Sequence, residues 1–261
     1  MPLGSDTLTP SVLPVIEGRA WPCIDFISDL HLCEQQPRTF EAWRDYLAST
    51  PAQALFILGD LFEVWVGDDV LHDPAAQFER RCLDALQQAA QRMAVHVMCG
   101  NRDFLLGDAL LRHTGLQPLV DPAVLQLESQ RVLLSHGDAW CLDDTEYLEF
   151  RAQVRSASWQ ASFLARPLHE RLALAREMRN TSESRKRTQA SYADVDDTLA
   201  DQWLLHNAAQ VLVHGHTHRP ATHTLPSGAL RHVLSDWDAD AAPTRVQVLR
   251  WQGTWHRVDL A

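Results

Sequence analysis

Short apolar runs, each followed by a small or polar residue, recur along the chain and predict buried β-strands. Five runs rich in Ile, Val, Leu and Phe lie at residues 24–28, 54–58, 95–99, 132–135 and 211–214. Helix-like stretches separate the first three runs, at 37–49 and 74–92. This alternation of strand and helix is typical of a layered α/β fold.

The pattern changes after the fifth run. Three further strand-like runs follow, at residues 230–234, 245–251 and 254–260. We expect them to form a second sheet, so that residues 21–142 and 209–261 make a two-sheet core with helices on the outside.

A helical insertion is predicted at residues 143–208, which contain no glycine and are dense in helix formers. Its apolar side chains are Phe150, Val154, Phe163, Leu164, Leu168, Leu172 and Met178. Such a stripe usually means core packing, and a ligand-binding role is the alternative. Residues 1–20 contain several prolines and only one short apolar run, which predicts a flexible tail.

The charge balance argues against a general nucleic-acid binder. The chain has 23 basic and 34 acidic residues, a formal charge of −11, whereas a protein that follows a phosphate backbone needs a positive surface. An anionic ligand would therefore have to be held locally. The predicted insertion differs from the rest, because nine basic residues against three acidic ones lie between positions 151 and 187.

The cysteines and the hydropathy of the chain indicate the cellular compartment in which the protein is expected. The five cysteines are odd in number and form no CxxC pair, which favours a reducing, cytoplasmic environment. The first residues lack the long apolar stretch of a signal peptide. No run reaches the roughly 20 apolar residues of a membrane span, so any membrane contact is expected to be peripheral.

Polar motifs follow five of the predicted strands, where the loops of an α/β sheet converge on one crevice. The motifs are Asp29-Leu30-His31, Gly59-Asp60, Gly100-Asn101-Arg102-Asp103, His136-Gly137-Asp138 and His214-Gly215-His216-Thr217-His218. Taken singly, an Asp-x-His or Gly-Asp pair is more often turn chemistry than a ligand set. All five in this order indicate a metal centre with nitrogen and oxygen ligands, suited to Mn, Fe, Co or Zn.

The spacing of the motifs predicts seven ligands. Residues i and i+2 of an extended chain project to the same side, which pairs Asp29 with His31 and His216 with His218. The other three candidates are Asp60, Asn101 and His136. Seven ligands are too many for one ion and suit two ions that share a bridging carboxylate, for which Asp60 is the candidate.

The motif series resembles the calcineurin-like metallophosphoesterases, which have two mixed β-sheets flanked by helices and a two-metal site. The longer strings FISDLHL, ILGDLFEVWVGDD, GNRDFLLG, LLSHGDAWCLDD and LVHGHTHRP resemble the UDP-2,3-diacylglucosamine hydrolases of lipid A biosynthesis. The likeness runs from about residue 25 to residue 237. It implies an α/β fold of this kind with a helical insertion that acts as a lid.

The resemblance also implies roles for single residues. One metal, usually manganese, would be held by Asp29, His31, Asp60 and His218, and the other by Asp60, Asn101, His136 and His216. The implied catalytic residues are Asp60, Asn101, Arg102, His136 and His216. The implied substrate contacts are Asn101, Arg102, Asp144, Ser182 and His216. Lys186 and Gln189 stand where the family has Asn and Lys, so the substrate contacts of the insertion depart from the family pattern.

Arg102 separates this sequence from many relatives, which carry at this position a His that can protonate an alkoxide leaving group. An Arg stays protonated and cannot act as a general acid, but it can hold a diphosphate. Cleavage of a phosphoanhydride expels a phosphate, which needs little protonation. The alternative is a structural Arg paired with Asp103 or another nearby acid.

The reaction implied is attack of a metal-activated water on the phosphorus next to uridine, which yields UMP and 2,3-diacylglucosamine 1-phosphate (lipid X). The insertion would provide an apolar groove for two acyl chains, with a basic flank for the diphosphate and an anionic membrane surface. The implied location is the cytoplasmic face of the inner membrane of a Gram-negative bacterium, without a predicted protein partner. The alternatives are cleavage of another nucleotide-linked diphosphate or phosphodiester, and a binding scaffold.

Overall fold

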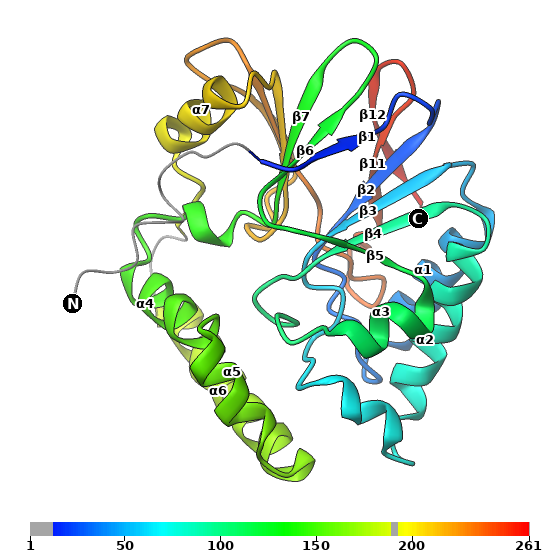
Figure 1. Ribbon diagram of the computed structural model, residues 1–261, viewed down its shortest axis with the longest axis vertical. Helices are drawn as coiled ribbons and strands as arrows, with labels where there is room; N and C mark the ends of the chain where they lie inside the picture. The colour runs from blue at the N-terminus through cyan, green and yellow to red at the C-terminus, as the bar shows by residue number, and fades with distance from the viewer. Residues whose placement is uncertain (1–12, 189–192, 261) are drawn as a thin grey trace.

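The computed structural model describes residues 13–188 and 193–260, and side chains of the long insertion helix only up to residue 179. Its core is a sandwich of two six-stranded mixed sheets (Figure 1). Sheet A has the order β1 (Val15–Glu17), β6 (Ala123–Gln126), β7 (Arg131–Ser135), β8 (Val211–His214), β10 (Leu230–Val233) and β9 (Ala221–Thr224). Sheet B has the order β12 (Trp255–Asp259), β11 (Gln247–Trp251), β2 (Ile24–Ile27), β3 (Ala54–Leu58), β4 (Ala94–Met98) and β5 (Gln117–Leu119).

The layers follow from alternation along the strands. One face of each sheet points inward, where Phe26 and Phe56 of sheet B meet Leu125, Leu134 and Val213 of sheet A. The outer face of sheet B is covered by α1 (Pro37–Ser49), α2 (Gln77–Ala90) and α3 (Asp108–Thr114). The α/β sandwich predicted from the sequence is thereby confirmed.

The assignment of the C-terminal strands to a second sheet is wrong in part. Of the three runs, only β10 lies in sheet A, where it pairs in parallel with β8. The other two, β11 and β12, extend sheet B, because β11 pairs antiparallel with β2. Periodicity reveals a strand but not its neighbour, so the partner of β11 could not be read from the sequence.

The N-terminal prediction also needs a correction. Part of the predicted flexible tail, Val15–Glu17, forms β1 and pairs in parallel with β6 at the edge of sheet A. Residues 1–12 of that tail lie outside the described residues.

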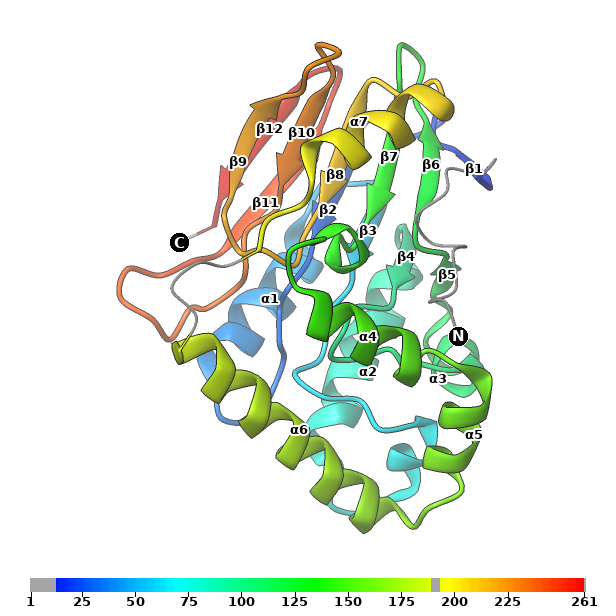
Figure 2. The same ribbon diagram turned by 90° about the vertical axis from the view of Figure 1, so that its left-hand side faces the viewer.

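The predicted insertion contains α4 (Thr145–Val154), α5 (Ala157–Leu164), α6 (Leu168–Thr188) and α7 (Asp197–His206). Helix α7 belongs to the core, because Trp203 and Leu204 pack with Leu133 and Leu212 on the outer face of sheet A. Figures 1 and 2 show α7 against β7 and β8, while α4, α5 and α6 extend away from the sandwich. The segment that projects is therefore α4 to α6, shorter than the predicted range 143–208.

A buried ion pair fixes β2, the strand that leads into the first polar motif. The Asp25 carboxylate is fully buried and accepts hydrogen bonds from Arg250 of β11, at 2.7 and 2.8 Å. It also accepts from Tyr46 and Thr50, at 2.8 and 2.6 Å. One side chain thus ties β2 to β11 and to the end of α1.

We predict that Asp25→Ala lowers the free energy of unfolding by about 3–5 kcal/mol, because it leaves the Arg250 guanidinium and the Tyr46 hydroxyl without their buried acceptor. Urea denaturation followed by circular dichroism measures the change. The control is Asp45→Ala, which removes a carboxylate from an exposed pair with Arg44 and should change stability by less than about 0.5 kcal/mol. Equal effects of the two substitutions would contradict the role of Asp25.

Candidate metal centre

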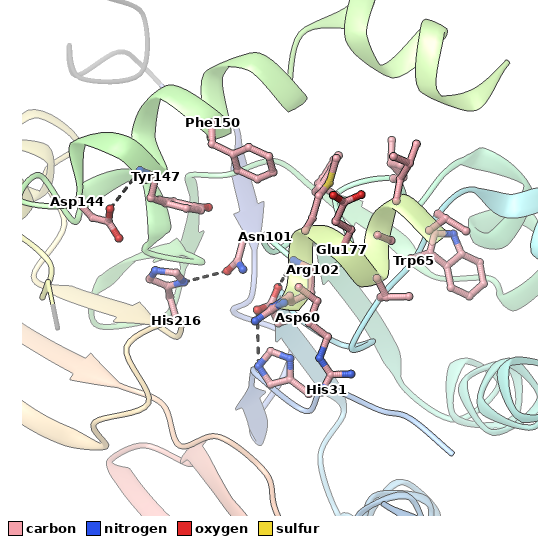
Figure 3. A pocket seen from close by; sticks show the side chains of 18 of the residues that line it. His31, Asp60, Trp65, Asn101, Arg102, Asp144, Tyr147, Phe150, Glu177 and His216 are labelled. Carbon is pink, nitrogen blue, oxygen red and sulfur yellow. Dashed lines mark hydrogen bonds and ion pairs between the residues drawn. The ribbon is translucent and has the colours of Figure 1, made fainter. Parts of the chain in front are cut away.

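The predicted ligands come together at one edge of the sandwich, where the strands of both sheets end. The turns after β2 and β3 carry Asp29, His31 and Asp60, and the turn after β4 carries Asn101. Figure 3 shows His31, Asp60, Asn101 and His216 facing one another across this edge. All seven side chains lie in the described part of the chain, so the expected convergence of the motifs is seen in the structure.

Five of the seven have a backbone conformation that L-residues rarely adopt. The residues with positive φ are Asp29 (53°), His31 (47°), Asp60 (52°), His216 (67°) and His218 (54°). Each such residue costs on the order of 1–3 kcal/mol and persists only where its surroundings hold it. The sharp turns aim these side chains away from the strand axis and into the site.

Two glycines of the motifs permit the close approach of the loops. A Cβ on Gly100 would lie 2.1 Å from Asp60 Oδ1, and a Cβ on Gly59 would lie 2.4 Å from His136 Nδ1. The Gly-Asp and Gly-Asn pairs seen in the sequence are therefore packing requirements of the site as well as turn residues.

The first group of ligands contains Asp29, His31 and His218. His218 Nε2 lies 3.2 Å from Asp29 Oδ1 and 3.4 Å from His31 Nε2. Asp60 approaches from the other side, with Oδ2 3.7 Å from His31 Nε2. The ligand atoms of the first three residues lie within 4.8 Å of one another, a spacing that one cation can bridge.

The second group is built around the Asn101 amide oxygen. His136 Nε2 and His216 Nδ1 each lie 3.0 Å from Asn101 Oδ1. Asp60 reaches this group as well, since its Oδ1 lies 3.8 Å from His136 Nε2. Asp60 therefore contacts both groups, as the prediction of a bridging carboxylate requires. Asp29, Asp60 and His136 also satisfy the spacing of a ligand group.

The electrostatics of the site favour a cation. Burial lowers the pKa of His136, but the carboxylates of Asp60, Asp138 and Asp29 raise it more, to about 9. Burial raises the pKa of Asp29, yet the surrounding histidines, His218 foremost, lower it to well below its usual value. Carboxylate charge is thus concentrated among imidazoles, and these nitrogen and oxygen donors fit a pair of divalent cations.

One imidazole is oriented by the backbone. His136 Nδ1 lies 2.9 Å from the Leu58 carbonyl oxygen, which requires a proton on Nδ1. The other ring nitrogen, Nε2, faces the oxygens of Asn101 and Asp60, where a bound cation would replace its proton. This arrangement is common among metal-binding histidines.

The Arg102 side chain lines the cavity, and the acid beside its guanidinium is Glu63 and not Asp103. Asp103 is fully buried and accepts hydrogen bonds from the backbone amides of Gly100, Leu61 and Phe62 instead. The Arg102 guanidinium lies 3.8 Å from Glu63 Oε1, so another nearby acid stands where the alternative placed Asp103. The pairing of Arg102 with Asp103 is therefore not seen.

A cavity of about 470 Å³ opens next to the ligands, between the core and the projecting helices. Its polar wall includes His31, Asp60, Asn101, Arg102, Asp144, His216 and His218. Its apolar wall includes Val64, Trp65, Phe104, Leu105, Phe150, Trp159, Phe163, Leu174 and Met178. Phe150, Phe163 and Met178 of the predicted apolar stripe line this cavity (Figure 3 shows Phe150), whereas Leu168 and Leu172 pack against the core.

Of the two substrate contacts predicted in the insertion, Asp144 and Ser182, only Asp144 has a side chain among the described residues. Asp144 lines the cavity and caps α4, where its Oδ1 accepts a hydrogen bond from the Tyr147 amide at 3.1 Å. The side chain of Ser182 lies outside the described residues, as do those of Lys186 and Gln189.

Four of the nine basic residues of the insertion contact the core. Arg151 and Arg155, one helical turn apart, both approach the buried Asp138 carboxylate. Arg171 is 1% exposed and donates to the Val66 carbonyl and the Asp69 carboxylate. Arg179 Nε lies 3.0 Å from Glu63 Oε1. These four guanidinium groups face the core, so they do not form the basic outer flank expected for a membrane surface.

Three residues of the site were missed by the sequence analysis. Asp138 stood within a quoted motif, and the i, i+4 arginines of α4 were the signal that could have paired it. Tyr147 donates to Asp138, and its ring lies 5.8 Å from that of His216. Glu63 follows Asp60 by three residues, but its partners His31, Arg102 and Arg179 come from three separate segments, which no local pattern reveals.

Comparison with known proteins agrees with this geometry. The family model described as calcineurin-like phosphoesterase matches residues 24–220. The chain belongs to this family. The phosphoesterase is also similar to curated relatives that carry one name, UDP-2,3-diacylglucosamine hydrolase.

The relative from Aromatoleum aromaticum is 43% identical over 235 residues, which cover 87% of the phosphoesterase and 92% of the relative. The relative from Ralstonia nicotianae is 41% identical over 260 residues, which cover 95% and 96%. Among solved structures, a novel archaeal phosphodiesterase aligns with 90% of the phosphoesterase and 98% of its own chain, at 10% identity and a TM-score of 0.47.

We predict that Asp60→Asn weakens Mn²⁺ binding by more than about 100-fold, because outer partners of metal ligands alone are worth 10–100-fold and Asp60 contacts both ligand groups. Isothermal titration of the metal-free phosphoesterase measures the affinity. Asp84→Asn, an exposed carboxylate on α2, is the matched control and should bind Mn²⁺ like the unmodified protein. Tight binding of two ions by Asp60→Asn would contradict the bridging role.

Proposed function

We propose that the chain hydrolyses the pyrophosphate bond of UDP-2,3-diacylglucosamine to UMP and 2,3-diacylglucosamine 1-phosphate. The observation that carries this proposal is the apolar cavity, which opens directly onto the cluster of carboxylates and imidazoles. A diphosphate at the cluster and acyl chains in the cavity would use both walls. The names of the relatives support the same substrate.

The ligand assignment is part of the proposal. One divalent ion would be held by Asp29, His31, Asp60 and His218, and the other by Asp60, Asn101, His136 and His216. Manganese is the proposed metal, because the donor set lacks sulfur and combines carboxylate, amide and imidazole. Such ions supply a deprotonated water as nucleophile and neutralise the phosphoryl oxygens.

The side chains around the ions position the diphosphate. Arg102 and His216 line the cavity on either side of Asn101, within reach of phosphoryl oxygens at the cluster (Figure 3). Arg102 remains charged and donates hydrogen bonds without transferring a proton. The leaving group is the lipid-linked phosphate, whose low basicity makes a general acid unnecessary.

The sugar and acyl chains would lie under the projecting helices. Asp144, on the rim of the cavity, is the proposed acceptor for polar groups of the sugar, and Ser182 is the proposed second contact. The aromatic side chains of α4 and α5, among them Phe150, Trp159 and Phe163, would contact the acyl chains. An unacylated nucleotide-linked diphosphate, the alternative substrate, would leave this apolar wall in water.

We also propose that the protein acts at the cytoplasmic face of the inner membrane, where a diacylated substrate resides. In residues 13–188 and 193–260, none of the helices has the length and apolar character of a membrane span. Contact with the bilayer would then be peripheral. The exposed Leu164, at the end of α5 and next to the cavity helices, is a candidate contact.

The first test is a UMP-release assay with purified protein, Mn²⁺ and UDP-2,3-diacylglucosamine in detergent. We expect rapid release of UMP, and at least about 100-fold lower kcat/KM with the unacylated UDP-glucosamine, because burial of the acyl chains is lost. Preferential cleavage of the unacylated nucleotide sugar would overturn the lipid assignment.

The second test is Arg102→Ala, which should lower kcat/KM by about 100-fold or more, since charged donors to the transition state are worth about 3–4 kcal/mol. Mn²⁺ content, measured by elemental analysis, should not change. Arg112→Ala, on α3, provides the control for loss of one arginine. Loss of metal from Arg102→Ala would show that the residue supports the ligands instead.

A further inference from the structure

Glu63 occupies a position between the ligand cluster and the insertion. It follows β3 in the loop that carries Asp60, and its side chain is only 14% exposed. Its two carboxylate oxygens face different groups. Oε2 lies 3.1 Å from His31 Nδ1, whereas Oε1 lies 3.0 Å from Arg179 Nε and 3.8 Å from Arg102 Nη1.

We propose that Glu63 is a positioning residue that orients the metal ligand His31 through one carboxylate oxygen and links Arg102 to helix α6 through the other. The inference rests on the proposed function for its substrate, but its metal-binding part is independent of the substrate. Nothing in the motif series assigns a role to Glu63.

The contact with His31 sets which ring nitrogen faces the cluster. A carboxylate is an acceptor only, so a close approach of Oε2 to Nδ1 favours the tautomer with the proton on Nδ1. His31 Nε2, which lies 3.4 Å from His218 Nε2 and 3.7 Å from Asp60 Oδ2, is then left with its lone pair toward the ligand group. Glu63 thereby acts on His31 through a close charge contact at Nδ1, whereas the Leu58 carbonyl holds His136 Nδ1 by a hydrogen bond.

The contacts of the other oxygen connect two cations that come from different elements. Arg102 belongs to the loop after β4, and Arg179 belongs to α6. Both side chains line the cavity, and the carboxylate between them offsets their mutual repulsion. Arg179 of α6 is therefore part of the same network as Arg102 and His31.

An ordinary surface ion pair would not have these properties. Glu63 is mostly buried, and it offers one oxygen to an imidazole and the other to guanidinium groups. Removing a shared, buried carboxylate leaves each of its partners uncompensated, whereas an exposed pair contributes little.

Two substitutions separate the two oxygens. Glu63→Gln keeps an oxygen that can accept from His31 Nδ1 but removes the charge that the arginines face. We expect its Mn²⁺ dissociation constant to stay within about 3-fold of the unmodified protein, while KM for UDP-2,3-diacylglucosamine rises by about 10-fold. Glu63→Ala removes both functions, so its Mn²⁺ affinity should fall by about 10–100-fold as well.

The experiment measures Mn²⁺ binding by isothermal titration without substrate, and then kcat and KM with substrate. Arg179→Ala should reproduce the rise in KM without the loss of Mn²⁺ affinity. Glu34→Gln and Glu34→Ala, which change an exposed carboxylate three residues from His31, control for net charge and should change neither quantity. Thermal unfolding of each variant verifies that it folds.

Unchanged Mn²⁺ affinity in a folded Glu63→Ala variant would overturn the link to His31. Unchanged KM in Glu63→Gln and in Arg179→Ala would overturn the link to the insertion. If the unmodified protein binds Mn²⁺ but does not cleave the substrate, the proposed function fails, and the affinity series still decides the role of Glu63 toward His31.

Discussion

The site depends on one close approach, that of the loop after β4 to the Asp60 carboxylate. Gly100 lies so close to Asp60 that a side chain at position 100 would clash with the Asp60 carboxylate. The backbone amide of Arg102, two residues further along the loop, donates a hydrogen bond to Asp60 Oδ1 at 2.8 Å. This contact fixes the central carboxylate from behind and leaves its other oxygen free to face His31. The loop itself is held by the buried Asp103, whose carboxylate ties the β4 loop to the turn after β3. The left-handed conformation of Asp60 is therefore stabilised by contacts on both sides.

The contacts of the basic residues show that part of the positive charge of the insertion faces the core and not the solvent. A net charge of −11 and a basic insertion suggest two surfaces of opposite sign. In the described structure, much of the basic excess is internal, because Arg151, Arg155 and Arg171 meet carboxylates or carbonyl groups of the core. Ion pairs and the packing of Phe163, Leu168 and Leu172 against the core together attach the insertion around an apolar cavity. Cavity-lining side chains such as Phe150 and Met178 stay available for a ligand.

Much of the core and the candidate ligands could be predicted because their signals are local. Buried strands appear as apolar runs, and the ligands follow them at the positions where loops converge. The short strands β1, β5, β6 and β9 escaped, since runs of three or four residues give little periodicity. The partner of β11 and the helix α7 were misassigned, because pairing and packing join segments distant in sequence. Glu63 and Asp138 escaped for the same reason, as their partners lie on α4 and α6.

The point at which the projecting helices leave the core has one further consequence. The Asp196 amide donates a hydrogen bond to the Trp140 carbonyl at 2.9 Å, so the chain departs from the sandwich and returns to it at nearly the same place. A segment closed in this way imposes little on the register of β7 and β8, and the entropy of closing it grows only slowly with its length. The helices between these two residues therefore form an exchangeable module. A lineage could enlarge, shorten or replace the binding chamber while the register of the two strands is kept.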